Sequence, residues 1–295
     1  MTQSVSGFDV PPWFTRAVTA EPQRHVLEAF GVGIHYRTWG EPVHSGLVLV
    51  HGAGAHSGWW DHIAPLVRSR RVVALDLSGH GDSGHRRTYD MALWAREILA
   101  VIAAERLHRP VVVGHSMGGR AAVTAAVEHP GSLAAIVCVD TPLTRHRTGD
   151  LDRRNAARPP SVYPTVQEAI FRFRTRPPLE ALPAHVRDHV ARESLRAVEG
   201  GWTWKGDEGV FGQGQRMQDL LPRVACPMAL LRGEHGLIPP EMAGEMAALT
   251  TSPIPVIELA DTGHHPMLDR PLILATALRT LLAVWPDGTA AGTDS

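Results

Sequence analysis

The sequence predicts an α/β fold in which a mostly parallel central β-sheet is flanked by helices. Five short runs are rich in Val, Leu and Ile, and such nearly continuous apolar runs are typical of strands that are covered on both faces. Segments with apolar residues at helical spacing alternate with these runs, as in repeated strand–helix units. The expected strands are residues 46–50, 71–76, 110–114, 133–140 and 227–233, and the expected helices are residues 91–107, 117–129 and 271–285.

The overall composition argues against several classes of protein. The chain has 295 residues, of which 44% are hydrophobic, and it has no apolar run near the roughly 20 residues that a membrane-spanning helix needs. A formal net charge of -1 leaves no large field of one sign, so nucleic acid is not an expected partner. Cys138 and Cys226 lie in apolar runs and the first residues resemble no secretion signal, so a cytoplasmic protein is expected. A homo-oligomer is left open.

A long segment interrupts the alternation of strands and helices. From about residue 143 to residue 221 no strong buried strand is recognisable, whereas Arg and Pro accumulate. Because a structureless stretch of this length is uncommon inside a compact domain, we expect a small, mostly helical cap. The predicted organisation is a core of residues 1–142 and 216–295, with a cap of residues 143–215 inserted after the sixth strand.

The motif with the clearest chemical meaning is V-V-V-G-H-S-M-G-G at residues 111–119. It places Ser116 in a Gly-X-Ser-X-Gly pattern, directly after a predicted strand and directly before a predicted helix, which is the context that this motif requires. The flanking glycines leave room for a tight turn that exposes the Ser116 hydroxyl at the carboxyl edge of the sheet. The amino terminus of the following helix favours developing negative charge at the same place.

Together with three further motifs, this segment resembles the α/β-hydrolase fold family over residues 24–285. V-H-G-A-G-A-H-S-G-W-W (50–60) is similar to the family's loop after the third strand, D-L-S-G-H-G-D-S-G (76–84) to the loop after the fourth, and D-T-G-H-H-P-M-L-D-R-P (261–271) to the histidine loop. The motifs also follow one another in the family's order. Since this fold hosts many chemistries, the resemblance predicts the fold more strongly than the substrate.

The resemblance implies roles for particular residues. Ser116 would be the nucleophile, which needs a neighbouring base to react at neutral pH, and His264 matches the family's base. His265 is the competing base, but adjacent residues in an extended loop point to different sides, and the family's Gly-His pattern favours His264. In the family, backbone N–H groups form the oxyanion hole, and the matching residues here are Ala53 and Met117.

The acid of the triad is not at its usual place. Many relatives carry an aspartate in the loop after the strand that matches residues 227–233, where this chain has Gly236. Asp140, at the end of the preceding strand, is the favoured substitute because some members of the fold place the acid there and because the order Ser, acid, His is kept. Glu234 is the second candidate, and a reduced Ser-His site is the third possibility. Asp261 is discounted because it is too close in sequence to His264.

These expectations describe a lidded serine hydrolase that cleaves carboxylic esters or lactones of hydrophobic small molecules through an acyl-enzyme. Two alternatives stay open: a C–C bond hydrolase that uses the same triad on vinylogous diketones, and a non-catalytic ligand-binding protein, which only Gly236 favours. No cofactor is expected, and the sequence has neither an H-E-x-x-H motif nor a cysteine pair at zinc spacing. The aromatic residues expected to wall an apolar substrate pocket are Trp59, Trp60, Trp202, Trp204 and Phe211.

Overall fold

A central sheet of eight strands organises the protein. A computed structural model describes residues 10–67, 70–143, 161–207 and 215–285. The strands lie in the spatial order β1-β2-β4-β3-β5-β6-β9-β10. Their bounds are β1 Gln23–Ala29, β2 Val32–Trp39, β3 Gly46–Val50, β4 Arg71–Leu75, β5 Val111–His115, β6 Ala135–Val139, β9 Met228–Gly233 and β10 Val256–Leu259.

The sheet is mostly parallel. From β4 to β10 in the spatial order all neighbouring strands run parallel, whereas β2 pairs antiparallel with both β1 and β4. Side chains alternate between two apolar clusters, so that in β3 Val48 and Val50 join the first core cluster and Leu47 and Leu49 join the second. Each of the five predicted strand runs is a strand of this sheet. The predicted α/β fold class is therefore confirmed.

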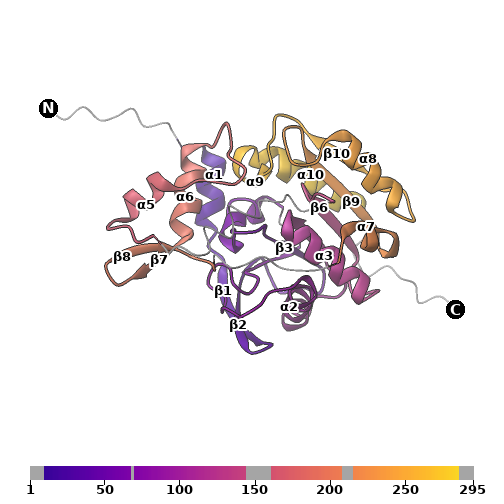
Figure 1. Cartoon of the computed structure of the whole chain (residues 1–295), viewed down its shortest axis with the longest axis horizontal. Helices are drawn as coiled ribbons and strands as arrows, with labels where there is room; N and C mark the ends of the chain where they lie inside the picture. Colours follow the sequence, from indigo (N-terminus) through magenta and orange to yellow (C-terminus); the bar gives the residue numbers. More distant parts are fainter. Residues whose placement is uncertain (1–9, 68–69, 144–160, 208–214, 286–295) are drawn as a thin grey trace.

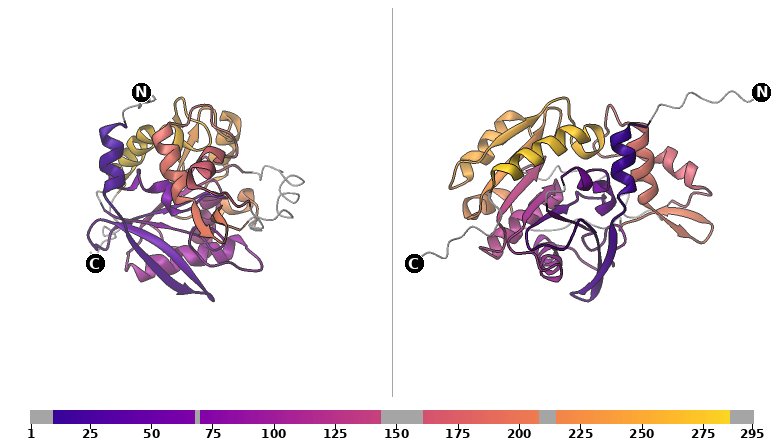
Figure 2. Two further views of the ribbon diagram at one scale, coloured as in Figure 1. Left: turned by 90° about the vertical axis from the view of Figure 1, so that its left-hand side faces the viewer. Right: turned by 180° about the vertical axis from the view of Figure 1, so that it is seen from behind.

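Helices cover both faces of the sheet. Their bounds are α1 Pro12–Thr19, α2 Met91–Ala104, α3 Met117–Glu128, α5 Val166–Arg172, α6 Ala184–Glu193, α7 Met217–Leu220, α8 Pro240–Leu249, α9 Pro266–Asp269 and α10 Pro271–Val284, with short 3-10 turns η1 Ser57–Trp60, η2 Ala64–Leu66 and η3 Leu221–Arg223. α2 and α3 share the first core cluster, and α1 and α10 share the second on the opposite face (Figure 1 and Figure 2). In the described part of the chain, no helix is both long and apolar enough to cross a membrane.

β1, β2 and β10 lie outside the strands that the sequence pattern predicts. β1 and β10 are the two edges of the sheet, and neither has the continuous buried run of the interior strands. β1 and β2 form a hairpin with Phe30 and Gly31 at its turn, where φ is 52° and 84°. Two positive φ values in succession are typical of tight turns between twisted strands. The edge strands escape prediction because half of their side chains face solvent.

The segment after β6 extends the molecule at one end. α5, α6 and the hairpin of β7 Leu195–Val198 and β8 Gly201–Trp204 lie together there, at the left of Figure 1. The two helices agree with the expected helical cap, whereas the hairpin was not indicated because its strands have few buried residues. Ile170, Val186 and Val190 of the two helices belong to the second core cluster. The division into separate core and cap domains stays a prediction, and Phe211 lies outside the described residues.

Candidate active site

Ser116 lies in a strained turn between β5 and α3. Its φ of 52° and ψ of -115° are rare for a residue with a side chain. Glycines make the turn possible, because a Cβ at Gly114 would lie 2.5 Å from Cα of Gly119, and a Cβ at Gly118 would lie 2.6 Å from the carbonyl oxygen of Val50. The turn holds the half-buried Ser116 at the carboxyl edge of the sheet.

His264 and Asp140 form a buried hydrogen bond at the same edge. Nδ1 of His264 lies 2.6 Å from Oδ2 of Asp140, and the two side chains are 4% and 0% exposed. Asp140 directly follows β6, and its carboxylate also accepts the backbone N–H groups of Gly233 at 3.2 Å and Leu237 at 2.7 Å. These contacts hold the carboxylate in one place. The hydrogen bond assigns a proton to Nδ1 of His264 and leaves Nε2 as the nitrogen that can act as a base.

Gly236 lies next to this pair, where there is no room for a side chain. A Cβ at Gly236 would lie within 2.7 Å of Cγ and Oδ2 of Asp140, in a space that the carboxylate already fills. No aspartate can therefore occupy position 236 while Asp140 keeps its present position. Glu234 is exposed and accepts the backbone N–H of Asp261 at 2.8 Å, away from His264. Of the two candidate acids, only Asp140 contacts the ring of His264.

His115, which sequence reasoning missed, ties the serine turn to the histidine loop. Its Nε2–H donates to the carbonyl oxygen of His264 at 2.8 Å. Burial, followed by the nearby rings of His264 and His265, holds the pKa of His115 well below its ordinary value, so this donor is a neutral imidazole. Among the described contacts no hydrogen bond joins Ser116 Oγ to His264, and such bonds are often long in sites without a substrate.

His265 contacts the segment after β6 as well as His115, the residue before Ser116. Its Nε2 lies 3.1 Å from the carbonyl oxygen of Arg176, and its ring packs edge-on against Trp59 with centroids 5.5 Å apart. Burial, then the neighbouring His264, lowers the pKa of His265 to about 3. Nδ1 of His264 thus faces a carboxylate and Nε2 of His265 faces the segment after β6, while the two rings pack edge-on with centroids 4.6 Å apart. The choice of His264 as the base stays a prediction.

The two backbone groups predicted to bind an oxyanion lie at neighbouring chain segments. Met117 is the first residue of α3, so its N–H has no partner within the helix. Ala53 lies at the exposed tip of the loop of residues 51–56, called the oxyanion loop below. Gly118 allows the start of α3 to approach the end of β3, from which this loop departs. The oxyanion role of both groups stays a prediction.

The predicted aromatic wall is only partly assembled. Phe173, which was not among the predicted residues, lies between Trp59 and Trp204, with ring centroids 6.2 Å and 5.8 Å away. Trp202 exchanges two backbone hydrogen bonds with Tyr163 farther along the cap. Trp60 has no exposed surface and packs in the second core cluster, so in this conformation it is a core residue rather than part of a pocket wall.

Two groups of side chains in the described residues resemble metal ligands. His115, His264 and His265 each offer a ring nitrogen, and these nitrogens lie within 4.8 Å of one another. One nitrogen of each ring is already hydrogen-bonded, so the cluster serves to connect the serine turn, the acid and the cap. In the second group Asp76 accepts from His35 and from the backbone of Asp82, which completes a structural turn.

A cleft of about 330 Å³ lies away from these residues. Its lining is residues 224–228 and residues 250, 252, 253 and 254, which precede β9 and β10. It therefore opens at the amino edge of the parallel sheet, whereas Ser116 lies at the carboxyl edge. Because ligands of open α/β sheets bind outside the carboxyl ends of the strands, this cleft is not the candidate substrate site.

Comparison with known proteins agrees with this geometry. The model of the family described as "Alpha/beta hydrolase family" matches residues 47–277. The chain belongs to this family. This alpha/beta hydrolase is 25% identical over 245 residues to esterase Rv0045c of Mycobacterium tuberculosis, covering 80% of this chain and 82% of that protein. It is also 33% identical over 102 residues to a pyrethroid hydrolase of Sphingobium wenxiniae, a match to 33% of this chain and 36% of that protein.

A solved structure also resembles this alpha/beta hydrolase in its fold. The crystal structure of E-2-(acetamidomethylene)succinate hydrolase superposes with a TM-score of 0.79 at 21% identity, covering 89% of this chain and all of that chain. At this identity the likeness concerns the fold alone.

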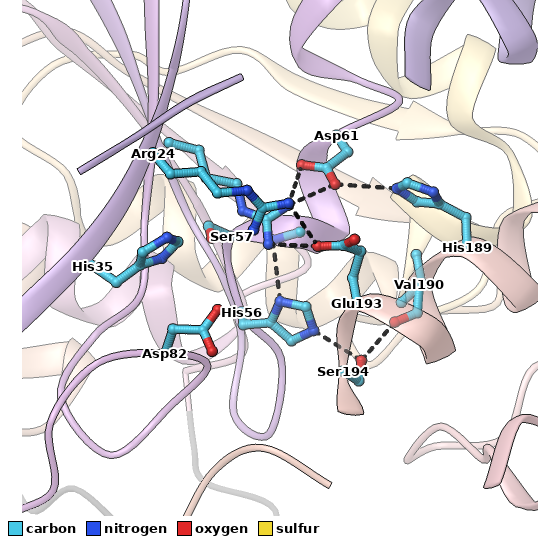
Figure 3. A network of polar contacts seen from close by, with 12 residues as sticks. Arg24, His35, His56, Ser57, Asp61, Asp82, His189, Val190, Glu193 and Ser194 are labelled. Atoms are coloured by element: carbon cyan, nitrogen blue, oxygen red, sulfur yellow. Dashed lines mark hydrogen bonds and ion pairs between the residues drawn. The ribbon is translucent and has the colours of Figure 1, made fainter. Parts of the chain in front are cut away.

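Sequence reasoning also missed a buried polar network that joins this hydrolase's cap helix α6 to its core (Figure 3). Arg37 of β2 donates to both carboxylate oxygens of Asp61, at 2.9 and 2.7 Å, and to Glu193 of α6 at 2.7 Å. His189 of α6 lies 3.1 Å from Asp61. Arg37 lies in a strand that also contains His35 and Thr38, and nothing local in the sequence reveals its partners.

Proposed function

We propose that this alpha/beta hydrolase is a serine hydrolase that cleaves carboxylic esters or lactones of hydrophobic small molecules. The observation that carries the proposal is the buried hydrogen bond between His264 and Asp140 beside the strained turn of Ser116. The proposed nucleophile, base and acid come from three different loops at the carboxyl edge of the sheet. Burying a carboxylate and holding Ser116 at a positive φ both cost free energy. Features of this kind gather at catalytic sites, and packing alone gives no reason for them here.

The reaction would follow from these groups in two halves. Nε2 of His264 takes the proton of Ser116 Oγ while Oγ attacks the carbonyl carbon of the ester, and Asp140 stabilises the imidazolium that forms. The N–H groups of Ala53 and Met117 bind the oxygen as it gains negative charge. His264 then gives the proton to the departing alkoxide, which leaves as the alcohol. A water molecule, deprotonated by His264, attacks the acyl-enzyme; the bond from the acyl carbon to Ser116 Oγ breaks, His264 returns the proton to Oγ, and the acid is released.

The apolar surroundings support a hydrophobic substrate. Trp59, Phe173 and Trp204 form a continuous aromatic row that starts beside His265. Small-molecule sites are commonly lined by such side chains. Two relatives are named an esterase and a pyrethroid hydrolase, which agrees with ester substrates of apolar character. We therefore favour esters with a medium-sized hydrophobic acyl or alcohol group.

The decisive experiment is the rate at which a fluorophosphonate labels the purified protein, with the adduct located by mass spectrometry. We expect fast labelling at Ser116, and Asp140→Asn should slow it and lower turnover by about 10⁴, the loss seen when a triad acid is weakened. Glu234→Gln is the matched control, because Glu234 faces the backbone of Asp261 and should leave the rate unchanged. Wild-type labelling no faster than that of denatured protein would reject the proposal and favour a ligand-binding protein.

A second measurement separates ester hydrolysis from C–C bond cleavage by the same residues. Not every similar protein is named an esterase: one that is 25% identical over 260 residues is named a 2-succinyl-6-hydroxy-2,4-cyclohexadiene-1-carboxylate synthase. Products should therefore be identified from a panel of esters, lactones and vinylogous diketones. Turnover confined to the esters and lactones is expected, and cleavage of the diketones alone would reassign the reaction.

A further inference from the structure

The oxyanion loop is tied to the cap helix α6 by a chain of three hydrogen bonds. The N–H of Gly58 donates to Nδ1 of His56 at 3.1 Å. Nε2 of His56 lies 2.8 Å from Oγ of Ser194, the residue that ends α6. Oγ of Ser194 donates to the carbonyl oxygen of Val190 at 2.7 Å. Figure 3 shows His56, Ser194 and Val190 in a row.

The directions of these hydrogen bonds are determined by chemistry. A backbone N–H can only donate, so Nδ1 of His56 must be the acceptor. A carbonyl oxygen can only accept, so the single proton of the Ser194 hydroxyl points to Val190. Nε2 of His56 must then carry the proton and donate it to Ser194 Oγ. Burial lowers the pKa of His56 to about 3, so the neutral imidazole that this chain requires is the form present near pH 7.

Ser57, the residue that follows the oxyanion loop, is held by the core. The N–H of Ser57 donates to Oδ1 of Asp76 at 2.5 Å. The other oxygen of Asp76 accepts from His35 at 2.8 Å and from the N–H of Asp82 at 2.9 Å. These contacts fix where the loop ends, but they do not contact its exposed tip at Ala53. The tip lies three residues before His56, and among the described contacts only His56 joins the loop to α6.

Helix α6 itself is firmly attached at this point. Glu193, next to Ser194, receives the buried guanidinium of Arg37 at 2.7 Å, and His189 one turn earlier reaches Asp61. Val186 and Val190 are fully buried on the same helix. Gly58 also allows close contact, because a Cβ there would lie 2.8 Å from Cε1 of His56 and 3.2 Å from Cβ of Glu193. The end of α6 is thus a fixed support rather than a part that swings away.

From these contacts we propose that Ser194 is a positioning residue for the oxyanion hole. By accepting the hydrogen bond of His56 Nε2–H, it holds the oxyanion loop where the N–H of Ala53 would bind the oxyanion formed at Ser116. The cap then contributes to the chemical step as well as covering the substrate. This inference rests on the proposed function, because it assigns a role within the proposed acyl transfer.

The variant Ser194→Ala tests the proposal. It removes the acceptor of the His56 proton and deletes none of the proposed catalytic groups. We expect kcat to fall about tenfold with KM unchanged, less than the 10²–10³ that follows the loss of a whole donor, because the Ala53 N–H is displaced and not deleted. Active-site titration with a fluorophosphonate should normalise the rates to the folded, reactive fraction.

A transition-state analogue distinguishes positioning from a general structural role. A trifluoromethyl ketone forms a tetrahedral adduct on a serine and places its oxyanion in the hole, whereas the corresponding secondary alcohol binds without an oxyanion. Ser194→Ala should lower the affinity for the ketone by the same factor as it lowers kcat/KM, and it should leave the affinity for the alcohol unchanged. A merely structural change would lower the affinities for both inhibitors or for neither.

Matched variants complete the test. Ser194→Thr keeps a hydroxyl and should retain most of the turnover. Ser132→Ala removes a hydroxyl that also donates to a carbonyl oxygen, on His129 at 2.7 Å, but is exposed and remote from the site, and it should have wild-type kinetics. His56→Gln combined with Ser194→Ala should cost no more than the larger single effect, because both remove one contact.

Two outcomes would overturn the inference, and each differs from a failure of the proposed function. Equal kcat and equal ketone affinity in wild type and Ser194→Ala would remove Ser194 from oxyanion positioning while leaving the hydrolase intact. Additive losses in the double variant would show that His56 and Ser194 act separately. Absence of fluorophosphonate labelling in the wild-type protein would instead reject the proposed function, and with it the role given to Ser194.

Discussion

The carboxylate of Asp140 occupies the space that a side chain at Gly236 would need. Asp140 follows β6 and Gly236 follows the neighbouring strand β9, so the two positions meet across adjacent carboxyl ends of the sheet. A Cβ at position 236 would lie 2.7 Å from Oδ2 of Asp140, the same oxygen that contacts His264. A glycine after β9 is therefore the steric counterpart of an acid after β6, and it does not mean that the site lacks an acid.

Gly236→Ala should impair the site although alanine is small and the backbone φ of Gly236 is not in the left-handed region. The added methyl group forces Asp140 to move, and misplacement of a catalytic group by about 1 Å can cost 10² in rate. We expect a fall of that order in kcat and a loss of about 1–3 kcal/mol in the free energy of unfolding, as for other overpacked sites. Steady-state kinetics and urea unfolding measure the two effects.

Gly244→Ala is the control for that substitution. Gly244 lies inside α8, and a Cβ added there would have no atom of another described segment within 4 Å. Alanine there should leave kcat unchanged and raise the free energy of unfolding by about 0.5–1 kcal/mol, because alanine is the better helix former. Equal kinetics in Gly236→Ala and Gly244→Ala would contradict the steric account of Gly236.

Asp61→Ala should destabilise the attachment of α6 to the core. The guanidinium of Arg37 is fully buried and would keep Glu193 as its one carboxylate partner. Breaking a buried pair by removing one partner typically costs about 3–5 kcal/mol. The double variant Arg37→Met with Asp61→Leu should recover part of this loss in urea unfolding, since the buried guanidinium is gone and Glu193 keeps its ion pair with Arg24. Additive losses in the double variant would contradict this interpretation.

Acid should destabilise the protein from about pH 6.5 downward, the ordinary pKa of histidine. Burial lowers the pKa to about 3 for His56 and His80 and to about 4 for His62. The unfolded chain binds these protons and the folded chain does not, so stability is complete above pH 6.5 and falls by about 1.4 kcal/mol per pH unit for each such histidine as the pH drops. Unfolding in urea at several pH values measures the slope.

His62→Gln isolates one of these contributions. Nε2 of His62 lies 2.6 Å from the carbonyl oxygen of Met267, a bond that a glutamine amide can replace. Between pH 6.5 and 4 the slope of unfolding free energy against pH should decrease by about one proton. An unchanged slope would mean that His62 is charged in the folded protein.

Trp59→Ala should change the preference for the acyl chain. Trp59 lies between His265 and Phe173 in the aromatic row beside the site. Burial of each methylene against such a surface is worth about 0.8 kcal/mol, so kcat/KM for p-nitrophenyl hexanoate should fall more than that for the acetate. Equal losses for both esters would show that Trp59 supports the site without contacting the acyl chain.

The local pattern of the sequence was sufficient for the five parallel strands in the interior of the sheet, but not for β2, whose buried side chains include His35, Arg37 and Thr38. A strand that is buried on both faces has to be apolar throughout, so residues 46–50 and 111–115 are recognisable without knowledge of their neighbours. The turn of Ser116 is equally local, because its glycines are needed within a few residues of the serine. β1 and the β7–β8 hairpin carry no such signal, since an edge strand or a two-stranded ribbon exposes much of its surface.

By itself, the sequence determined the fold class, five of the six interior strands of the sheet, the position of Ser116 and the two candidates for its acid. Only the tertiary structure brought Asp140 to His264, 124 residues away, and turned Glu234 toward Asp261. The same holds for the contact of Ser194 with His56. Such choices depend on which loops meet when the sheet assembles, and packing between distant segments decides them because residue type and spacing carry no record of contacts across the fold.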